Sequence, residues 1–213
     1  MLKGEELISE LLNDPQAFVN QAKPDLLLQE YFRGFPLDTL RPLIYSDDLY
    51  LKSAAAYILS ELGAQGKELI ADTVKLLNEE SAVVRFSAIE SIMTCATGEL
   101  ANYFVYVVQA LEDEHLGIRV QVMKLVYNAS TEQLLAAYNW YGGEDALIHK
   151  KGLDALLKVD SLSERDIYVL LDENNALGRK YGTIALKKIN QKFPGLSDKV
   201  LTSDDVELKK FFR

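Results

Sequence analysis

A pair of acidic residues followed by a cation recurs along the chain, and these residue types can do chemistry. Adjacent carboxylates can exchange protons or hold a metal ion, and a nearby cation can stabilise negative charge. The five copies are Asp47-Asp48 with Lys52, Glu79-Glu80 with Arg85, Asp113-Glu114 with Arg119, Glu144-Asp145 with His149, and Asp172-Glu173 with Arg179. The cations lie 33, 34, 30 and 30 residues apart. A period of this size is typical of stacked two-helix repeats rather than of separate catalytic sites.

Each cation is followed by an apolar pattern of helical period. After Arg85, apolar or small residues lie three, four, seven, eight and eleven positions on, which is one face of an α-helix. The fifth copy, after Arg179, matches this register least well. The third position after the cation is small in four copies, Ala55, Ala88, Gly152 and Gly182. Small side chains there would let neighbouring helices approach closely, which is a reason to retain glycine in a helix.

An amphipathic segment precedes each acidic turn, so the predicted unit is a helix, a short acidic turn and a second helix. The first helices are expected within 37–45, 67–78, 99–111, 131–141 and 164–171. The cation lies near the start of the second helix, where the helix dipole disfavours positive charge, so we expect the acidic pair to be its partner. Stacked copies would then alternate acids and cations as a polar ladder. His149 would be its weakest member, because its charge varies near neutral pH.

Three segments carry a resemblance to a known family. DDLYLKSAAAYILSELG, EESAVVRFSAIESIM and EDEHLGIRVQVMKLV resemble HEAT repeats, particularly the short HEAT-like type of many bacterial proteins. In that pattern a Val-Arg pair follows an Asp-containing turn. His149 and Arg179 depart from it, and the matching pairs are Leu51-Lys52, Val84-Arg85 and Ile118-Arg119. The resemblance covers about residues 37–193. It implies an all-α fold, a right-handed α-solenoid of about five two-helix repeats, and a protein-binding scaffold.

The ends of the chain lie outside the repeat register. Residues 1–36 contain short helical segments broken at Asp14-Pro15 and Lys23-Pro24, and we expect them to form an N-terminal cap. Residues 194–213 are expected to form a C-terminal cap that packs through Val206 and Phe211. With the repeats at 37–193, the chain 1–213 is predicted to be a single α-solenoid domain.

Charge and composition narrow the classes of function. The net charge of −9 argues against a nucleic-acid binder and fits a protein or peptide partner with a basic surface. No stretch approaches the roughly 18 apolar residues of a membrane-spanning helix, so no membrane partner is expected. The N-terminus lacks the apolar segment of a signal peptide. Cys95 is the only cysteine and is expected to be buried and inert, which favours a reducing cytoplasm.

The sequence contains no recognisable catalytic motif. His115 and His149 lie outside any HExxH motif, and a single cysteine argues against a zinc site. The chain has neither a GxxxxGK[ST] loop nor a GxGxxG motif after a strand. The paired carboxylates each have an explanation within the repeat. We therefore expect no catalytic residues, no cofactor-binding residues and no metal ligands.

The expected working surface is the face of each second helix that points away from the core. It comprises positions two, five and nine after the cation, and it would line the concave side of a curved array. The predicted partner-binding residues are Tyr57, Glu61, Glu90, Gln121, Lys124, Asn128, Lys151, Asp154, Lys158, Tyr181 and Lys188. This stripe is acidic at its N-terminal end and basic at its C-terminal end, which suits an extended polypeptide or a domain with mixed charges. The alternative is a solvated face with no partner. Tyr138, Trp140 and Tyr141 are a second, aromatic candidate surface, and packing in the core is the favoured alternative for them.

Three hypotheses for function remain open from the sequence. The leading one is a non-catalytic protein-interaction scaffold, and its narrower form is an immunity protein that binds a toxin domain. The alternative is a lyase-type enzyme or enzyme subunit on a HEAT-like scaffold, as in bilin lyases; this alternative requires a deep polar pocket with convergent titratable groups. The third is a regulatory subunit of a larger assembly.

Overall fold

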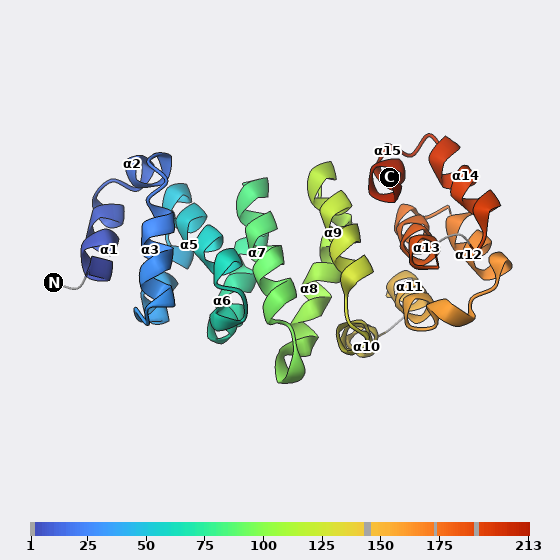
Figure 1. Ribbon diagram of the computed structural model, residues 1–213, viewed down its shortest axis with the longest axis horizontal. Helices are drawn as coiled ribbons and strands as arrows, with labels where there is room; N and C mark the ends of the chain where they lie inside the picture. Colours follow the sequence, from blue (N-terminus) through green and yellow to red (C-terminus); the bar gives the residue numbers. More distant parts are fainter. Residues whose placement is uncertain (1–2, 143–145, 173, 190–191) are drawn as a thin grey trace. The chain divides into compact units, whose positions relative to one another are not determined.

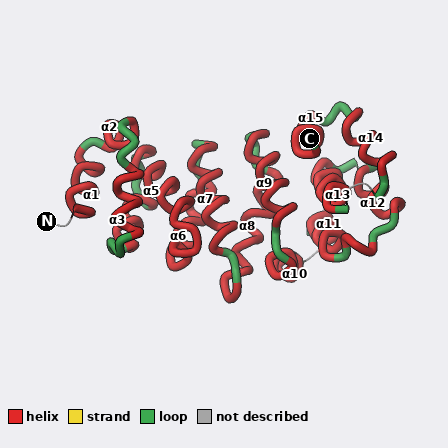
Figure 2. Tube along the Cα trace, in the orientation of Figure 1, coloured by secondary structure: helices red, strands yellow, loops and turns green. Residues whose placement is uncertain are grey.

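Helices are the only regular elements in the part of the chain that the structure describes. The computed structural model describes residues 3–142, 146–172, 174–189 and 192–213, and Figure 2 shows helices joined by loops throughout these ranges. The predicted all-α class is therefore confirmed. The helices divide into two compact units, unit 1 with Met1–Ala96 and unit 2 with Thr97–Arg213. A single continuous domain over 1–213 stays a prediction.

Unit 1 is built around the second helices of the first two predicted repeats. Its elements are α1 (Lys3–Asn13), α2 (Pro15–Asn20), α3 (Pro24–Phe32), η1 (Leu37–Leu40), α4 (Arg41–Ile44), α5 (Leu49–Leu62), η2 (Gly63–Leu69), α6 (Ile70–Thr73), η3 (Val74–Asn78) and α7 (Ala82–Cys95), where η marks a 3₁₀ helix. α5 and α7 lie side by side and make the most extensive contact in the unit (Figure 1). Ala55 and Ala88, three positions after their cations, are fully buried. α3 packs on α5, and α1 packs on α3.

The first helices of unit 1 are shorter and less regular than predicted. α4 and α6 are each one turn long, and 3₁₀ helices complete the predicted segments 37–45 and 67–78. Asp72 in α6 joins the two repeats, because it accepts hydrogen bonds from the Arg41 guanidinium and, at 2.8 Å, from the Tyr45 hydroxyl. A buried carboxylate with two donors is well satisfied, so this contact fixes α6 against α4.

Unit 2 contains the helices of the other three predicted repeats and the C-terminal segment. Its elements are η4 (Gly98–Tyr103), α8 (Phe104–Gln109), η5 (Ala110–Glu112), α9 (Leu116–Asn128), α10 (Thr131–Trp140), α11 (Leu147–Leu157), η6 (Val159–Ser161), α12 (Glu164–Leu171), α13 (Ala176–Lys188), α14 (Pro194–Thr202) and α15 (Val206–Phe212). α10 packs on α11 and α12 packs on α13, as expected for helix pairs. α13 packs on both α11 and α9, and α15 packs on α9 and α13 (Figure 1). Because α9 makes its main helix contacts with α13 and α15, a regular right-handed stack of five repeats stays a prediction.

Two glycines mark the closest helix approaches in unit 2. A Cβ atom on Gly152 of α11 would overlap the ring of Tyr181 in α13. A Cβ atom on Gly182 of α13 would lie 2.9 Å from Leu170 Cβ and 3.0 Å from the Leu171 nitrogen, both in α12. These contacts confirm that the small position after the cation permits close packing.

Candidate functional site

The recurring cations bind the backbone of the acidic turns. The Arg85 guanidinium donates to the carbonyl oxygens of Glu79 and Glu80 at 2.8 and 2.9 Å. Arg119 repeats this geometry with the carbonyls of Asp113 and Glu114, at 2.8 and 2.9 Å. These carbonyls follow the end of the preceding helix, where the helix dipole favours a cation. The sequence pattern led us to expect carboxylate partners, and it missed these backbone acceptors.

A contact of the predicted polar ladder is present within unit 1. Lys52 of the first copy lies 2.8 Å from the Glu79 carboxylate of the second copy, within unit 1. In unit 2, His149 Nε2 lies 3.4 Å from a carboxylate oxygen of Glu112, next to the third acidic pair. Glu144 and Asp145 of the fourth copy and Glu173 of the fifth lie outside the described residues. These contacts assign a structural role to the charges that first suggested chemistry.

His149 is part of a buried aromatic cluster. Its ring stacks on Tyr141 with ring centroids 4.4 Å apart, and its Nδ1 lies 2.9 Å from the hydroxyl oxygen of Tyr181. Burial lowers the pKa of His149, although the nearby Glu112 carboxylate opposes this shift. The neutral imidazole therefore packs between helices, and the fourth cation position carries no fixed charge.

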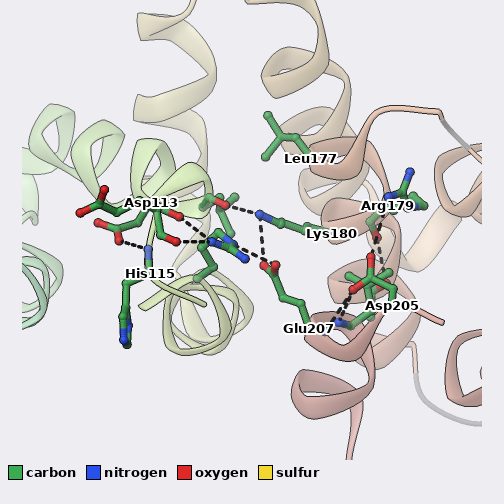
Figure 3. Close-up of polar contacts among 12 residues, drawn as sticks. Asp113, His115, Leu177, Arg179, Lys180, Asp205 and Glu207 are labelled. Carbon is green, nitrogen blue, oxygen red and sulfur yellow. Dashed lines mark hydrogen bonds and ion pairs between the residues drawn. The ribbon is translucent and has the colours of Figure 1, made fainter. Parts of the chain in front are cut away.

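A second polar cluster joins α9, α13 and α15 (Figure 3). Arg119 Nε lies 2.9 Å from the Glu207 carboxylate, and Lys180 Nζ lies 3.1 Å from the other oxygen of Glu207. Lys180 also donates to the carbonyl oxygen of Leu111. Burial lowers the pKa of Lys180, with Glu207 opposing the shift. Because the Glu207 carboxylate of α15 binds one cation from α9 and one from α13, the cluster links these three helices.

An open hollow of about 480 Å³ adjoins this cluster. It is lined by Glu112, Asp113, Glu114, Arg119, Asn175, Ala176, Leu177, Lys180 and Glu207. The enzyme hypothesis requires titratable groups that converge on a deep pocket. Among the titratable groups of this lining, Arg119 and Lys180 are already paired with Glu207. The hollow is therefore better explained as the edge of a structural ion cluster.

The predicted stripe is solvent-accessible at ten of its eleven residues. Glu61, Gln121, Lys124, Asn128, Lys151 and Lys158 are exposed, and Tyr57, Glu90, Asp154 and Lys188 are half-buried. Tyr181 is completely buried, so its assignment to a partner-binding surface is wrong. Its ring fills the space that Gly152 leaves, because α13 is covered by helices on more than one side. In unit 2, Asp154 and Lys158 of the stripe pair with each other at 2.7 Å.

In unit 1 the stripe borders an apolar hollow that the sequence did not reveal. The hollow has a volume of about 350 Å³ and is lined by Val19, Ala22, Pro24, Asp25, Ser53, Ala54, Tyr57 and Val83. These residues come from α2, α3, α5 and α7 and the turn between α2 and α3. Val83 is 72% exposed although it is apolar. Of the lining residues, only Ala54 and Tyr57 lie on the predicted face, because no local pattern indicates that residues 19–25 pack beside α5.

The hollow and three acidic residues, Asp25, Glu61 and Glu90, are here called the α5–α7 face; Asp25 lines the hollow, and Glu61 and Glu90 lie further along α5 and α7. Tyr57 donates its hydroxyl hydrogen to Asp25, and this bond raises the pKa of Tyr57 to about 12, with burial adding to the effect. One helical turn beyond Tyr57 lies Glu61. Burial, followed by repulsion from Glu61, raises the pKa of Glu90. Asp25, Glu61 and Glu90 thus form an acidic edge beside apolar side chains.

Two of the remaining candidate residues, Tyr141 and Cys95, are buried, and Trp140 is exposed. Tyr141 of the aromatic surface is buried, whereas Trp140 is 52% exposed and touches Tyr141 edge to face with ring centroids 5.3 Å apart. Cys95 is buried as predicted, its thiol donates to the Gly63 carbonyl at 3.3 Å, and burial raises its pKa. A buried thiol with a raised pKa is a poor nucleophile.

Comparison with known proteins does not assign the chain to a family. A scan against protein-family models and a search of curated proteins each found no match to the chain. None of the described helices is both long and apolar enough to cross a membrane. Within the same residues, no group of three or more His, Cys, Asp or Glu side chains is placed to hold a metal ion. The α5–α7 face is therefore the candidate site, on its geometry alone.

Proposed function

We propose that the chain is a non-catalytic protein-interaction module of the HEAT-like type that binds a basic protein or peptide on the α5–α7 face of unit 1. The observation that carries this proposal is the acidic edge of Asp25, Glu61 and Glu90 beside an apolar hollow. Apolar contact supplies affinity, and complementary charge supplies specificity and a fast association rate.

In the part of the chain that the structure describes, no lysine or arginine neutralises the charges of this edge. None of Asp25, Glu61 and Glu90 forms an ion pair with a described lysine or arginine, whereas Glu79 on a repeat turn pairs with Lys52. Burial raises the pKa of Glu90, and repulsion from Glu61 adds to this shift. Like charges placed together without counter-ions destabilise a surface, so a basic partner would relieve the repulsion.

The distribution of charge along the chain supports the same face. Unit 1 contains 8 Lys and Arg residues against 15 Asp and Glu residues, whereas unit 2 contains 15 against 17. The excess acid is therefore concentrated in the unit that holds the hollow. A field of this sign attracts basic partners over about 8 Å at physiological ionic strength.

Charge reversal on the face tests the proposal. The proteins encoded beside this gene are titrated against the full chain and against Glu61→Lys/Glu90→Lys, with affinity measured by calorimetry. The matched control is Glu6→Lys/Glu132→Lys, which changes the net charge equally at exposed positions away from the face. We expect at least a tenfold loss with the first double variant and little change with the second. Equal affinities for both variants would overturn the proposed face.

The immunity hypothesis is a narrower form of this proposal. It adds that the basic partner is a toxin domain, which the acidic face would occupy. Growth of cells that co-express a neighbouring toxin gene tests it: the chain should restore growth, and Glu61→Lys/Glu90→Lys should not. Binding without any restoration of growth would leave an interaction module that is not an immunity protein.

A further inference from the structure

We infer that the hollow of unit 1 takes one apolar side chain of an extended peptide whose lysine or arginine, two to four residues away, pairs with Glu61 and Glu90. This inference rests on the proposed function and names the ligand chemistry of the same site. The partner of the α5–α7 face is therefore a linear segment that carries both an apolar anchor and a cation. A basic surface alone would lack the anchor.

The size and lining of the hollow define the anchor. Its volume of about 350 Å³ is at the low end of the roughly 300–1,000 Å³ of ligand pockets, so it has room for one side chain and its flanking backbone. Val19, Ala22, Ala54 and Val83 form its apolar walls. An aliphatic side chain such as leucine removes both its own surface and that of Val83 from water, which favours binding.

The polar edge of the hollow can hold the peptide backbone. The Asp25 carboxylate accepts one hydrogen bond from Tyr57 and has further lone pairs available. The Ser53 hydroxyl also lines the hollow and can both donate and accept. A peptide N–H that reaches Asp25 would form a charge-assisted hydrogen bond, which fixes the chain direction beside the anchor.

Helix geometry sets the distance between anchor and cation. Glu61 lies four residues after Tyr57, or about 6 Å along α5 at a rise of 1.5 Å per residue. Glu90 lies seven residues after Val83, or about 10 Å along α7. An extended peptide advances about 3.3 Å per residue, so a cation two or three residues from the anchor reaches both carboxylates. The length of the lysine or arginine side chain extends the range to four.

Synthetic peptides test this spacing on the full chain. Each fluorescein-labelled peptide carries one leucine and one arginine in a Gly-Ser background, separated by one to six residues, and fluorescence polarisation measures its affinity. We expect the tightest binding at separations of two to four. Replacement of the leucine by serine, or of the arginine by glutamine, should weaken binding at least tenfold.

Two protein variants and a control test whether the peptide binds in the hollow. Val83→Ser removes an exposed wall of the hollow without disturbing the core, and we expect it to weaken binding three- to tenfold. Val169→Ser, at an exposed valine of α12 in unit 2, is the matched control and should leave the affinity unchanged. Glu61→Gln/Glu90→Gln should remove the preference for arginine over glutamine in the peptide.

Each contrary result has a distinct meaning. Binding that needs the arginine but neither the leucine nor Val83 would overturn the inference and leave the proposed function standing. Binding that is unaffected by Glu61→Gln/Glu90→Gln would overturn both. Absence of binding for every peptide at millimolar concentration would overturn the inference, while the titration of neighbouring gene products would still decide the proposed function. A doubling of mass that Val83→Ser abolishes would assign the hollow to a second copy of the chain and would also overturn it.

Discussion

At the scale of single residues, the recurring cations are anchors of the fold. Arg85 is buried and donates to two carbonyl groups that no longer belong to a helical ladder, so one side chain satisfies two backbone acceptors. Arg119 does the same in unit 2 and also binds Glu207. The cations that first suggested a chemical role are in this way engaged by backbone groups and, for Arg119, by a neighbouring helix.

The Arg85 geometry predicts a large loss of stability on truncation. Arg85→Met should lower the free energy of unfolding by about 2–4 kcal/mol, because it leaves two carbonyl groups without their charged donor. Urea unfolding measures this loss. Arg33→Met, at an exposed ion pair with Glu30, is the control and should change stability by less than about 1 kcal/mol. Similar effects from the two variants would contradict the anchoring role.

The burial of His149 should make the free energy of unfolding depend on pH. Its folded pKa is lowered by burial, so the unfolded chain binds a proton more readily than the folded chain. Its contribution is complete above the unfolded pKa of roughly 6.5 and is lost as the pH falls below that value. Chemical denaturation from pH 7.5 to 5 should therefore show a steeper decline for the wild type than for His149→Gln. His115→Gln, at an exposed histidine, should follow the wild type, and parallel curves for all three proteins would refute the account.

At the scale of elements, close helix contacts depend on the small residue after each cation. Gly152 admits the ring of Tyr181, and Gly182 admits the backbone of α12. An alanine in a helix is normally favoured over glycine by about 1 kcal/mol, so the contact must outweigh this preference. The contacts also explain why α13 is buried on several sides.

Gly152→Ala should destabilise the protein in spite of the helix preference. The added Cβ atom overlaps the buried Tyr181 ring, and overpacking of this kind costs about 1–3 kcal/mol. The thermal midpoint measures the change. Gly195→Ala in α14 is the control, because a Cβ atom there meets no atom within 4 Å, and this substitution should be neutral or stabilising. A stabilised Gly152→Ala variant would show that the helices can separate without loss.

The helices were predictable from sequence to the extent that their signals are local. The apolar period after each cation identified α5, α7 and α9, and the capping boxes at Ser130 and Ser163 begin α10 and α12 as expected. The same period placed Tyr181 on an open face and was wrong, since a single helix cannot report that neighbours cover both of its sides. The hollow was equally invisible, because it forms only where residues 19–25 meet α5 and α7.

At the scale of the whole molecule, charge is divided unevenly between the units. The excess of acid lies in unit 1, and three of its acids, Asp25, Glu61 and Glu90, belong to the α5–α7 face. The stripe inferred from the repeats predicted an acidic N-terminal end, and Tyr57, Glu61 and Glu90 lie together there. The repeat register did not predict the apolar hollow that completes the α5–α7 face.

This charge distribution predicts a salt-dependent interaction. The affinity for a leucine–arginine peptide should fall as sodium chloride rises from 50 to 500 mM, because screening shortens the range of the acidic field. Glu61→Gln/Glu90→Gln should make the affinity weaker and less sensitive to salt. Glu132→Gln, at an exposed acid of unit 2, should keep the salt dependence of the wild type. An affinity that does not change with salt would contradict an electrostatic contribution.

The most direct test of the central claim is to map the peptide on the full chain by NMR. Backbone amide shifts are followed while a leucine–arginine peptide with three intervening residues is added. We predict that the shifted amides are those of residues 19–25, Ser53, Tyr57, Glu61, Val83 and Glu90. Shifts centred on Lys124, Lys151 and Lys158, or on the hollow at Arg119 and Lys180, would place the binding surface in unit 2 and contradict the account.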